Sequence, residues 1–167
     1  TGQSMASSDW VFFHLGINEL YNLTTDEDVA AMIAKEFAQW ELMITSIKAA
    51  VSGVRVGMAI CIPPTASQDA FGTASNSGVS RQRYMRNLFL WTAAFVEQFG
   101  GRTASAIYLV PIHLNLDTLN NFPYGSAENI NSRNTTQITR QNNDVHPATS
   151  GYNQMADSFW AFLKAKA

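Results

Sequence analysis

The sequence predicts an α/β fold in which helices cover a parallel β-sheet. Three apolar, strand-like segments alternate with two amphipathic helical segments, and a further amphipathic helix ends the chain. Each connection between successive strands contains a helix, which is how parallel strands are joined. The chain has 167 residues, of which 46% are hydrophobic, and this suits one domain with a sizeable core rather than two.

The first strand is expected at the start of the segment "DWVFFHLGINEL". Its residues 11–13 are apolar on both faces, as in a strand that lies inside a helix-covered sheet. A long amphipathic helix should follow within residues 24–53. A capping box, Thr24 with Glu27, marks its start, an apolar stripe recurs at helical spacing, and Gly53 marks its end.

The remaining elements are expected in regular order. Residues 54–62 alternate larger and smaller side chains as a second strand, and residues 65–78 are small and polar, as in a surface loop. A helix should span residues 80–100, and a third strand lies within 105–116. Residues 117–143 are rich in Asn, Thr and Gly without periodicity, which predicts a long functional or mobile loop.

The last helix should open near Ser150 and bury an apolar stripe composed of Tyr152, Met155, Phe159, Phe162 and Leu163. Several residues that could carry chemistry are expected instead in the core, because they lie within apolar strands or helical stripes: Cys61, His14, His113, Trp40, Trp91 and Trp160. The single cysteine excludes a disulfide framework. No zinc-binding spacing is present, so we expect no metal and no cofactor.

Charge and hydropathy exclude some partners and leave the compartment open. The formal charge is -2 and no basic block is present, so nucleic acid is not an expected partner. The sequence contains neither an apolar run long enough to cross a bilayer nor a signal peptide, so we expect a soluble chain with no membrane partner. Sequons at Asn22 and Asn134 would matter only in a secretory host, for example on a secreted, surface or viral assembly.

Two motifs stand where the carboxyl ends of parallel strands should meet. The motif "LGINEL" follows the first strand, and "NDVHPATSGYNQMAD" follows the third strand and its loop. The first resembles the Gly-x-Asn-Asp block of the SGNH (GDSL-like) hydrolase superfamily, and the second resembles its final Asp-x-x-His-Pro block. The order of helices and strands between them is also similar. The resemblance covers essentially this whole chain but only the C-terminal half to two-thirds of the family's fold.

The resemblance implies a three-layer α/β/α, flavodoxin-like fold, with residues 1–167 forming the C-terminal part of a single domain. It implies ester hydrolysis through an acyl-serine intermediate, with a short acyl group such as acetyl carried on carbohydrate. His146 would be the general base and Asn18 would donate its amide to the oxyanion. Gly16 would let the turn carry Asn18 close to the substrate.

The sequence departs from the family pattern beside the histidine. The family's carboxylate lies three residues before the histidine, where this chain has Asn143, and Asp144 lies two residues before it. The group that orients His146 is therefore left open between Asp144, Asn143 and a backbone carbonyl. Glu19 also replaces the family's Asp, which we interpret as a tolerated structural change.

The nucleophile block of the family, Gly-Asp-Ser, is absent, and so is the following block that carries an oxyanion-hole glycine. "GQSM" at residues 2–5 resembles a Gly-Gln-Ser variant, but no strand precedes it and too few residues separate Ser4 from Asn18. The first strand would also lie at a sheet edge with unpaired backbone groups. We therefore expect a complementary polypeptide segment to supply the family's first strands and the serine.

Two other functions remain open from the sequence. One is a carbohydrate-binding module in which a degenerate hydrolase fold keeps the pocket without the reaction. The other is a structural domain whose site is vestigial. The missing serine and the departure at Asn143 favour the binding module, whereas the joint presence of the Asn18 and His146 motifs favours the esterase.

Overall fold

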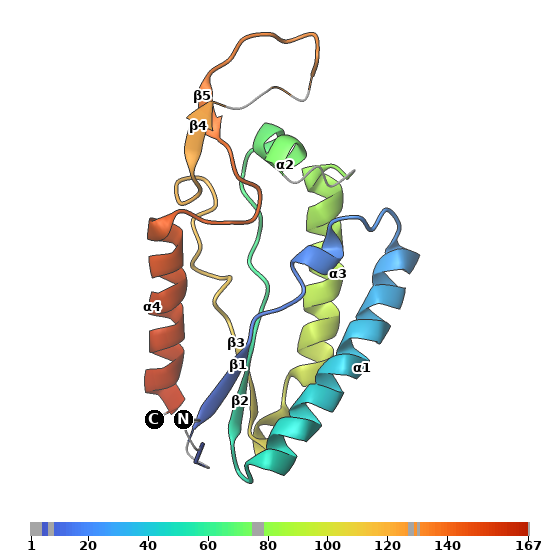
Figure 1. Ribbon diagram of the computed structural model, residues 1–167, viewed down its shortest axis with the longest axis vertical. Helices are drawn as coiled ribbons and strands as arrows, with labels where there is room; N and C mark the ends of the chain where they lie inside the picture. The colour runs from blue at the N-terminus through green and yellow to red at the C-terminus, as the bar shows by residue number, and fades with distance from the viewer. Residues whose placement is uncertain (1–4, 7–8, 75–78, 127–128, 130, 167) are drawn as a thin grey trace.

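The computed structural model describes residues 5–6, 9–74, 79–126, 129 and 131–166 of the chain (Figure 1). Its main elements, in chain order, are β1 (Trp10–Phe13), α1 (Asp26–Ala50), β2 (Arg55–Ala59), α2 (Gln68–Ala74), α3 (Arg81–Phe99), β3 (Ile107–Val110), β4 (Tyr124–Ser126), β5 (Thr139–Gln141) and α4 (Thr149–Lys166). Two short 3-10 helices, η1 (Asn18–Leu20) and η2 (Arg102–Ser105), follow β1 and α3.

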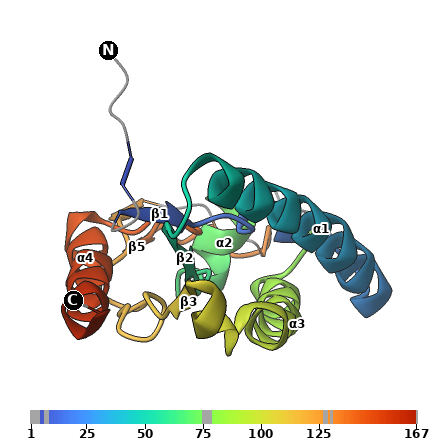
Figure 2. The same ribbon diagram turned by 90° about the horizontal axis from the view of Figure 1, so that it is seen from below.

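The predicted α/β class and the parallel sheet are confirmed. The sheet has the order β1-β2-β3, and both neighbouring pairs are parallel. Phe12 is aligned with Gly57, which is aligned with Tyr108. Among the described strands, β1 is therefore an edge strand, as expected from the sequence, and Figure 2 shows it at one side of the sheet.

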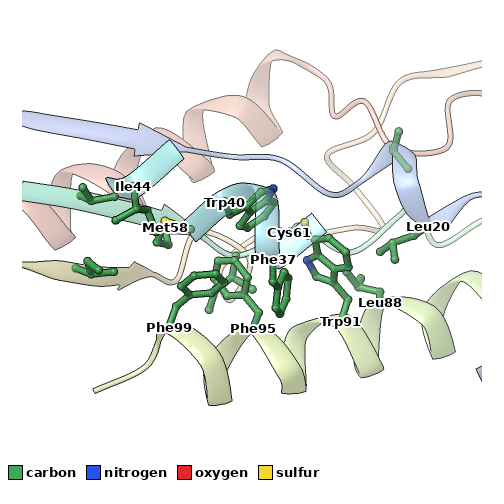
Figure 3. Close-up of a cluster of buried hydrophobic side chains, with 14 of the residues drawn as sticks. Leu20, Phe37, Trp40, Ile44, Met58, Cys61, Leu88, Trp91, Phe95 and Phe99 are labelled. Carbon is green, nitrogen blue, oxygen red and sulfur yellow. The ribbon is translucent and has the colours of Figure 1, made fainter. Parts of the chain in front are cut away.

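Helices α1 and α3 cover one face of the sheet (Figures 1 and 2). Their contact consists largely of aromatic rings in edge-to-face arrangements, for example Phe37 with Trp91 at 5.0 Å and Trp40 with Phe95 at 5.5 Å between ring centroids. Such geometry adds to the stabilisation that burial of apolar area provides. Figure 3 shows these rings together with Met58 of β2 and Cys61, so Trp40, Trp91 and Cys61 are core residues as predicted.

Helix α4 covers the opposite face, where Phe159 contacts Phe12 of β1 with ring centroids 4.9 Å apart. The predicted burial of two of its residues is wrong, because Tyr152 is 48% exposed and Trp160 is 65% exposed. Met155 is buried as predicted, and the helix also turns Gly151 and Ser158 towards the protein. Gly151 allows a close approach, since a Cβ atom there would lie 2.6 Å from Cβ of Pro147.

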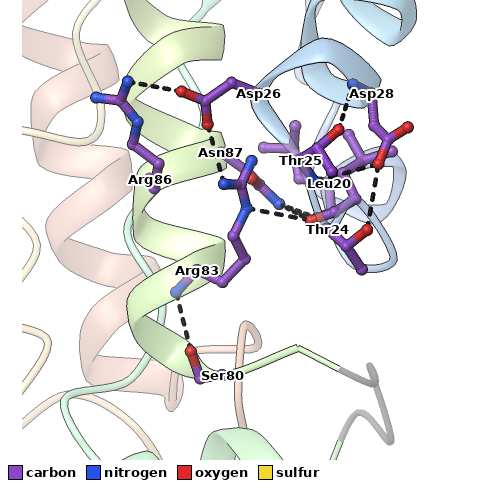
Figure 4. A network of polar contacts seen from close by, with 10 residues as sticks. Leu20, Thr24, Thr25, Asp26, Asp28, Ser80, Arg83, Arg86 and Asn87 are labelled. Atoms are coloured by element: carbon purple, nitrogen blue, oxygen red, sulfur yellow. Dashed lines mark hydrogen bonds and ion pairs between the residues drawn. The ribbon is translucent and has the colours of Figure 1, made fainter.

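Helix α1 begins one residue later than the sequence predicted. Thr25, not Thr24, is the N-cap: its hydroxyl oxygen accepts a hydrogen bond from the Asp28 amide at 3.0 Å, and its own amide donates to the Asp28 carboxylate at 3.1 Å (Figure 4). The Thr24 hydroxyl donates to the same carboxylate at 3.3 Å. The capping box is real, but Asp28 takes the place predicted for Glu27.

The segment predicted as a surface loop, residues 65–78, contains helix α2. This helix has only seven residues, and small side chains dominate its sequence, so no apolar periodicity marks it. Tertiary contact explains its formation, because Phe71 is fully buried and contacts the rings of Tyr21 and Tyr84, with ring centroids 6.1 and 5.1 Å apart.

The long segment predicted as a loop, residues 117–143, contains an antiparallel pair, β4 and β5. Each strand has three residues, which is too short for an alternating pattern to be recognised in the sequence. The hairpin rises at the same end of the molecule as α2 (Figure 1). Arg140 of β5 forms an ion pair with Asp69 of α2 and joins the two elements.

The buried side chain of Gln141 fixes the end of this hairpin. Its carbonyl oxygen accepts hydrogen bonds from the Thr65 hydroxyl at 2.6 Å and the Ser67 amide at 2.9 Å. Its amide donates to the carbonyls of Thr118 and Leu119. A buried amide that satisfies all these groups holds the loop between β2 and α2 against the segment after β3.

None of the helices in the described ranges is long and apolar enough to cross a lipid bilayer.

Candidate active site

The structure brings Gly16, Asn18 and His146 together in one pocket of about 260 Å³. The pocket lies beyond the carboxyl ends of β1 and β2, because Gly16 and Asn18 follow β1 and Ile62, which also lines it, follows β2. This is the end of a parallel sheet where ligand sites gather. The two sequence motifs, which are far apart in the chain, therefore contribute to the same cavity.

Gly16 has the conformation that its predicted role in the turn requires. Its φ angle is +111°, in the region that disfavours residues with a side chain. A Cβ atom at this position would lie 2.7 Å from Cε2 of Trp91, so the turn passes directly over the indole ring. The backbone carbonyls on either side of Gly16 also accept hydrogen bonds. The Cys61 thiol donates to the Leu15 carbonyl at 3.1 Å, and the Tyr84 hydroxyl donates to the Ile17 carbonyl at 3.2 Å.

Asn18 begins η1 and is exposed at the pocket. Among the described residues, its side-chain amide makes no hydrogen bond to the protein. An unpaired amide that lines a pocket can donate to a bound oxygen atom. The next residue, Glu19, also lines the pocket and is half-buried.

His146 is exposed at the pocket, and its backbone rather than its imidazole is fixed by neighbours. Its amide donates to Oδ1 of Asn143 at 2.9 Å, and the buried Pro147 follows. Within the described ranges the imidazole has no hydrogen-bond partner. Asn143 therefore shapes the turn that carries His146 and does not bind the ring.

Asp144 is 5% exposed, and its carboxylate hydrogen bonds are to Tyr21 and Val145 rather than to the His146 ring. Its Oδ2 atom accepts a hydrogen bond from the Tyr21 hydroxyl at 2.9 Å, and its Oδ1 atom accepts one from the Val145 amide at 2.8 Å. Burial, followed by the hydrogen bond and the negative charge of Asp144, raises the pKa of Tyr21 above its usual value. Tyr21 thereby stays protonated and links the two motif loops.

Several pocket residues were not predicted from the sequence. His14 was expected in the core but is exposed and lines the pocket, where partial desolvation lowers its pKa. Its place at the end of β1, just before the Gly16 turn, is the signal that could have identified it. Tyr152 was expected to be buried and lies at the pocket instead. His113 is half-buried away from this pocket, and desolvation lowers its pKa as well.

No serine lines this pocket in the part of the chain that the structure describes. Ser4 lies outside the described residues. Cys61 is not a candidate nucleophile, because burial raises the pKa of its thiol to about 12 and the reactive form of cysteine is the thiolate. The described ranges contain no group of three or more His, Cys, Asp or Glu side chains that could hold a metal ion.

Comparisons with known proteins assign no family to the chain. No family model matches it, and no curated protein matches it. The function therefore has to be inferred from the pocket and the residues that line it.

Proposed function

We propose that this chain supplies the general base and an oxyanion donor of an SGNH-type serine esterase. The observation that carries the proposal is that Gly16, Asn18 and His146, predicted from two separate motifs, line one pocket beyond the carboxyl ends of parallel strands. We also propose that residues 1–167 form the C-terminal part of a three-layer, flavodoxin-like domain. A complementary segment would complete that domain and carry the serine.

The chemistry follows from the residue types. His146 takes the proton from the serine hydroxyl as the serine oxygen attacks the ester carbonyl, and the carbonyl oxygen becomes an oxyanion that accepts a hydrogen bond from Asn18. Collapse of the tetrahedral intermediate breaks the ester bond, and the departing alcohol takes the proton from His146. Water then attacks the acyl-serine by the same route, which releases the acid and restores the serine.

Asn143 and Asp144 are positioning residues in this proposal. The Asn143 side chain binds the backbone of His146, and Asp144 binds Tyr21, which lies just after η1. Together these bonds set the loop of the base against the turn of the oxyanion donor. No backbone carbonyl of the described ranges binds the imidazole either, so the group that orients the ring stays open in this proposal.

The pocket favours a small acyl group. Its volume of about 260 Å³ is below the usual range for ligand pockets, which is roughly 300 to 1,000 Å³. Leu15, Ile62 and Met155 give it an apolar side, and Tyr152 offers an aromatic ring beside it. A short acyl group such as acetyl suits the cavity, and a carbohydrate acceptor could stack on Tyr152.

Substitutions in the complete assembly, with the complementary segment present, test this proposal. His146→Ala should reduce hydrolysis of 4-nitrophenyl acetate to background, because no base remains to take the serine proton. Asn18→Ala should lower turnover about 100- to 1,000-fold, the usual effect of removing one oxyanion donor. Asn22→Ala, the same change at an exposed asparagine outside the pocket, is the matched control and should leave turnover unchanged. Unchanged turnover in both His146→Ala and Asn18→Ala would contradict the proposed mechanism.

A non-catalytic carbohydrate-binding or structural domain is the second candidate. The observation that favours it is that the His146 imidazole has no partner, and that no serine lines the pocket, within the described ranges. If this candidate is correct, the complete assembly will bind acylated carbohydrate without hydrolysing it, and Tyr152→Ala will weaken that binding.

A further inference from the structure

A second cavity lies beside the β4–β5 hairpin, at the end of the molecule where the hairpin and α2 stand together (Figure 1). Its volume is about 250 Å³. Three segments that are distant in the sequence line it: residues 66–67 before α2, Leu119 with Tyr124, and residues 139–141 of β5. None of these residues lines the pocket of His146, so the two cavities are separate. We call the second one the Tyr124 cavity.

The three segments are fixed to one another by side-chain contacts. The buried Gln141 side chain joins the Ser67 amide to the Leu119 carbonyl. The Tyr124 hydroxyl also donates to the Leu119 carbonyl, at 2.8 Å. The Arg140 side chain is held by its ion pair with α2 and is only 15% exposed. A cavity whose walls are fixed in this way is largely preformed, as ligand pockets usually are.

Tyr124 contributes an aromatic ring to this cavity, and the residue is 52% exposed. In the register of the hairpin, Tyr124 is aligned with Gln141 and Ser126 is aligned with Thr139. Because alternate residues of a strand share a face, Tyr124 and Thr139 lie on the same face of the hairpin. The hydrogen bond at the Tyr124 hydroxyl restrains the ring, and the exposed part of the ring is available to the apolar face of a ligand.

Polar groups without a partner line the same cavity. The Ser67 hydroxyl accepts a hydrogen bond from the Ala70 amide at 3.2 Å, and among the described residues it has no acceptor for its own hydrogen. The Thr139 hydroxyl makes no hydrogen bond in the same ranges. Arg140 pairs with Asp69 through Nη1, whereas its Nε atom is buried and has no partner within the described part of the chain. The cavity thus combines unused donors with a charge that Asp69 already balances, which suits an uncharged ligand rich in hydroxyl groups.

We propose that the Tyr124 cavity binds one ring of an uncharged carbohydrate. A sugar ring has an apolar face of C–H groups, which packs on the Tyr124 ring, and hydroxyl groups at its rim, which bond to Ser67 and Thr139. An apolar peptide side chain would leave these polar groups unpaired, and unpaired polar groups are costly to bury. The volume suits a single ring, since larger ligands usually occupy about 300 to 1,000 Å³.

The cavity also lies within a limited distance of the pocket of His146. His146 follows Gln141 by five positions, so the Cα atoms of these two residues are at most about 18 Å apart. A carbohydrate of a few units bound in the Tyr124 cavity is long enough to span this distance. This link rests on the proposed function, because it makes the cavity a subsite for the carbohydrate whose ester is cleaved. Binding in the Tyr124 cavity itself does not depend on catalysis.

Titration of the full chain with carbohydrates, followed by amide NMR spectra, tests the binding. The probes are the uncharged tetrasaccharides cellotetraose, mannotetraose and chitotetraose. At least one of them should shift the amide signals of Ser67, Tyr124, Thr139 and Gln141 until the site is saturated. Two comparison probes should bind more weakly: cyclohexanol, an apolar ring with one hydroxyl group, and tetragalacturonate, an acidic tetrasaccharide.

Substitutions identify the groups that bind. Tyr124→Ala removes the ring and should weaken tetrasaccharide binding about tenfold or more, whereas Tyr124→Phe keeps the ring and should retain most of the affinity. Thr139→Val removes a hydroxyl that has no partner in the described ranges, and affinity should fall about 2- to 10-fold, as for one hydrogen bond. Trp160→Ala is the matched control, because this ring is 65% exposed on α4 outside the cavity, and binding should be unchanged.

Several results would overturn the proposal. These are the absence of shifts with all three tetrasaccharides, tighter binding of cyclohexanol or tetragalacturonate, and equal affinity of Tyr124→Ala and the native chain. Loss of binding in Tyr152→Ala but not in Tyr124→Ala would place the carbohydrate in the pocket of His146 instead. Because binding is measured without turnover, failure of this proposal is distinguishable from failure of the esterase proposal, which is tested with His146→Ala.

Discussion

The hydrogen bond between Tyr21 and Asp144 joins two segments that are far apart in the chain. Tyr21 follows η1, which carries Asn18, and Asp144 precedes His146 by two residues. Asp144 also accepts a hydrogen bond at its backbone carbonyl from the Thr65 amide at 2.7 Å, so the loop after β2 reaches the same point. One buried carboxylate thus sets the relative position of the two loops that form the pocket.

Gly16→Ala should destabilise the protein by about 2 to 4 kcal/mol, which combines a disfavoured φ angle with overpacking against Trp91. Gly101→Ala is the matched control, because Gly101 also has a positive φ, +71°, but a Cβ atom there would meet nothing within 4 Å. We expect a loss of about 1 kcal/mol for the control. Urea unfolding measures both values, and equal losses would show that contact with Trp91 is not the constraint on Gly16.

Cys61 should make stability fall as the pH rises above 9. Its thiol has an ordinary pKa of 9.0, and burial raises this to about 12 in the folded protein. As the pH rises, the unfolded chain therefore releases the thiol proton before the folded protein does. The contribution of the thiol to the free energy of unfolding is fully present below pH 9. It is lost between pH 9 and 12, by at most about 1.4 kcal/mol per pH unit. The raised pKa of Tyr21 and of Tyr84 adds a similar loss only above their ordinary value of 10.0.

Urea unfolding of the native protein and of Cys61→Ala between pH 8 and 10 separates the effect of the thiol on stability from the effects of other titrating groups. The variant is expected to be less stable at every pH because it leaves a small cavity, but its stability should stay nearly constant from pH 9 to 10. Parallel pH profiles for the two proteins would contradict the assignment.

At the scale of elements, the first turns of α3 hold the connection between η1 and α1 in place (Figure 4). The fully buried Asn87 donates its side-chain amide to the carbonyl of Leu20 at 3.0 Å and to that of Leu23 at 2.8 Å. Arg83 and Arg86 both form ion pairs with Asp26 in the first turn of α1. Since Asn18 begins η1, these contacts position the proposed oxyanion donor indirectly.

Asn87→Ala should lower the free energy of unfolding by about 2 to 4 kcal/mol, because two buried carbonyls lose their donor. Arg86→Ala removes a solvent-exposed ion pair on the same helix and should have a much smaller effect. Chemical denaturation of the two variants beside the native protein makes the comparison. A larger loss for Arg86→Ala would mean that the ion pairs, not the buried amide, secure this connection.

At the scale of the whole molecule, the sequence predicted the parallel sheet, its covering helices and the convergence of Gly16, Asn18 and His146. These features depend on long apolar patterns and on the rule that parallel strands end at the same edge. Both are readable without tertiary contacts. The same reasoning placed Trp40 and Trp91 in the core, where the structure has them.

Features that depend on tertiary contact were missed. Helix α2 and strands β4 and β5 are each too short to produce a periodic pattern of apolar residues in the sequence. Burial of Phe71 stabilises α2, and contacts of Gln141 and Arg140 hold the two strands. The exposure of His14 at the pocket depends on which segments, distant in the sequence, pack beside it. The local sequence around His14 does not indicate those segments.

We propose that His146 activates a serine carried by a complementary segment. Fluorophosphonate labelling of the natural, unfractionated assembly tests this proposal most directly. Mass spectrometry then locates the labelled residue, and the His146→Ala protein is the control. We predict a labelled serine in a segment that co-purifies with this chain, with labelling lost in the control. Labelling of Ser4 would contradict the role of the segment. No labelling, or labelling unaffected by His146→Ala, would contradict the esterase mechanism.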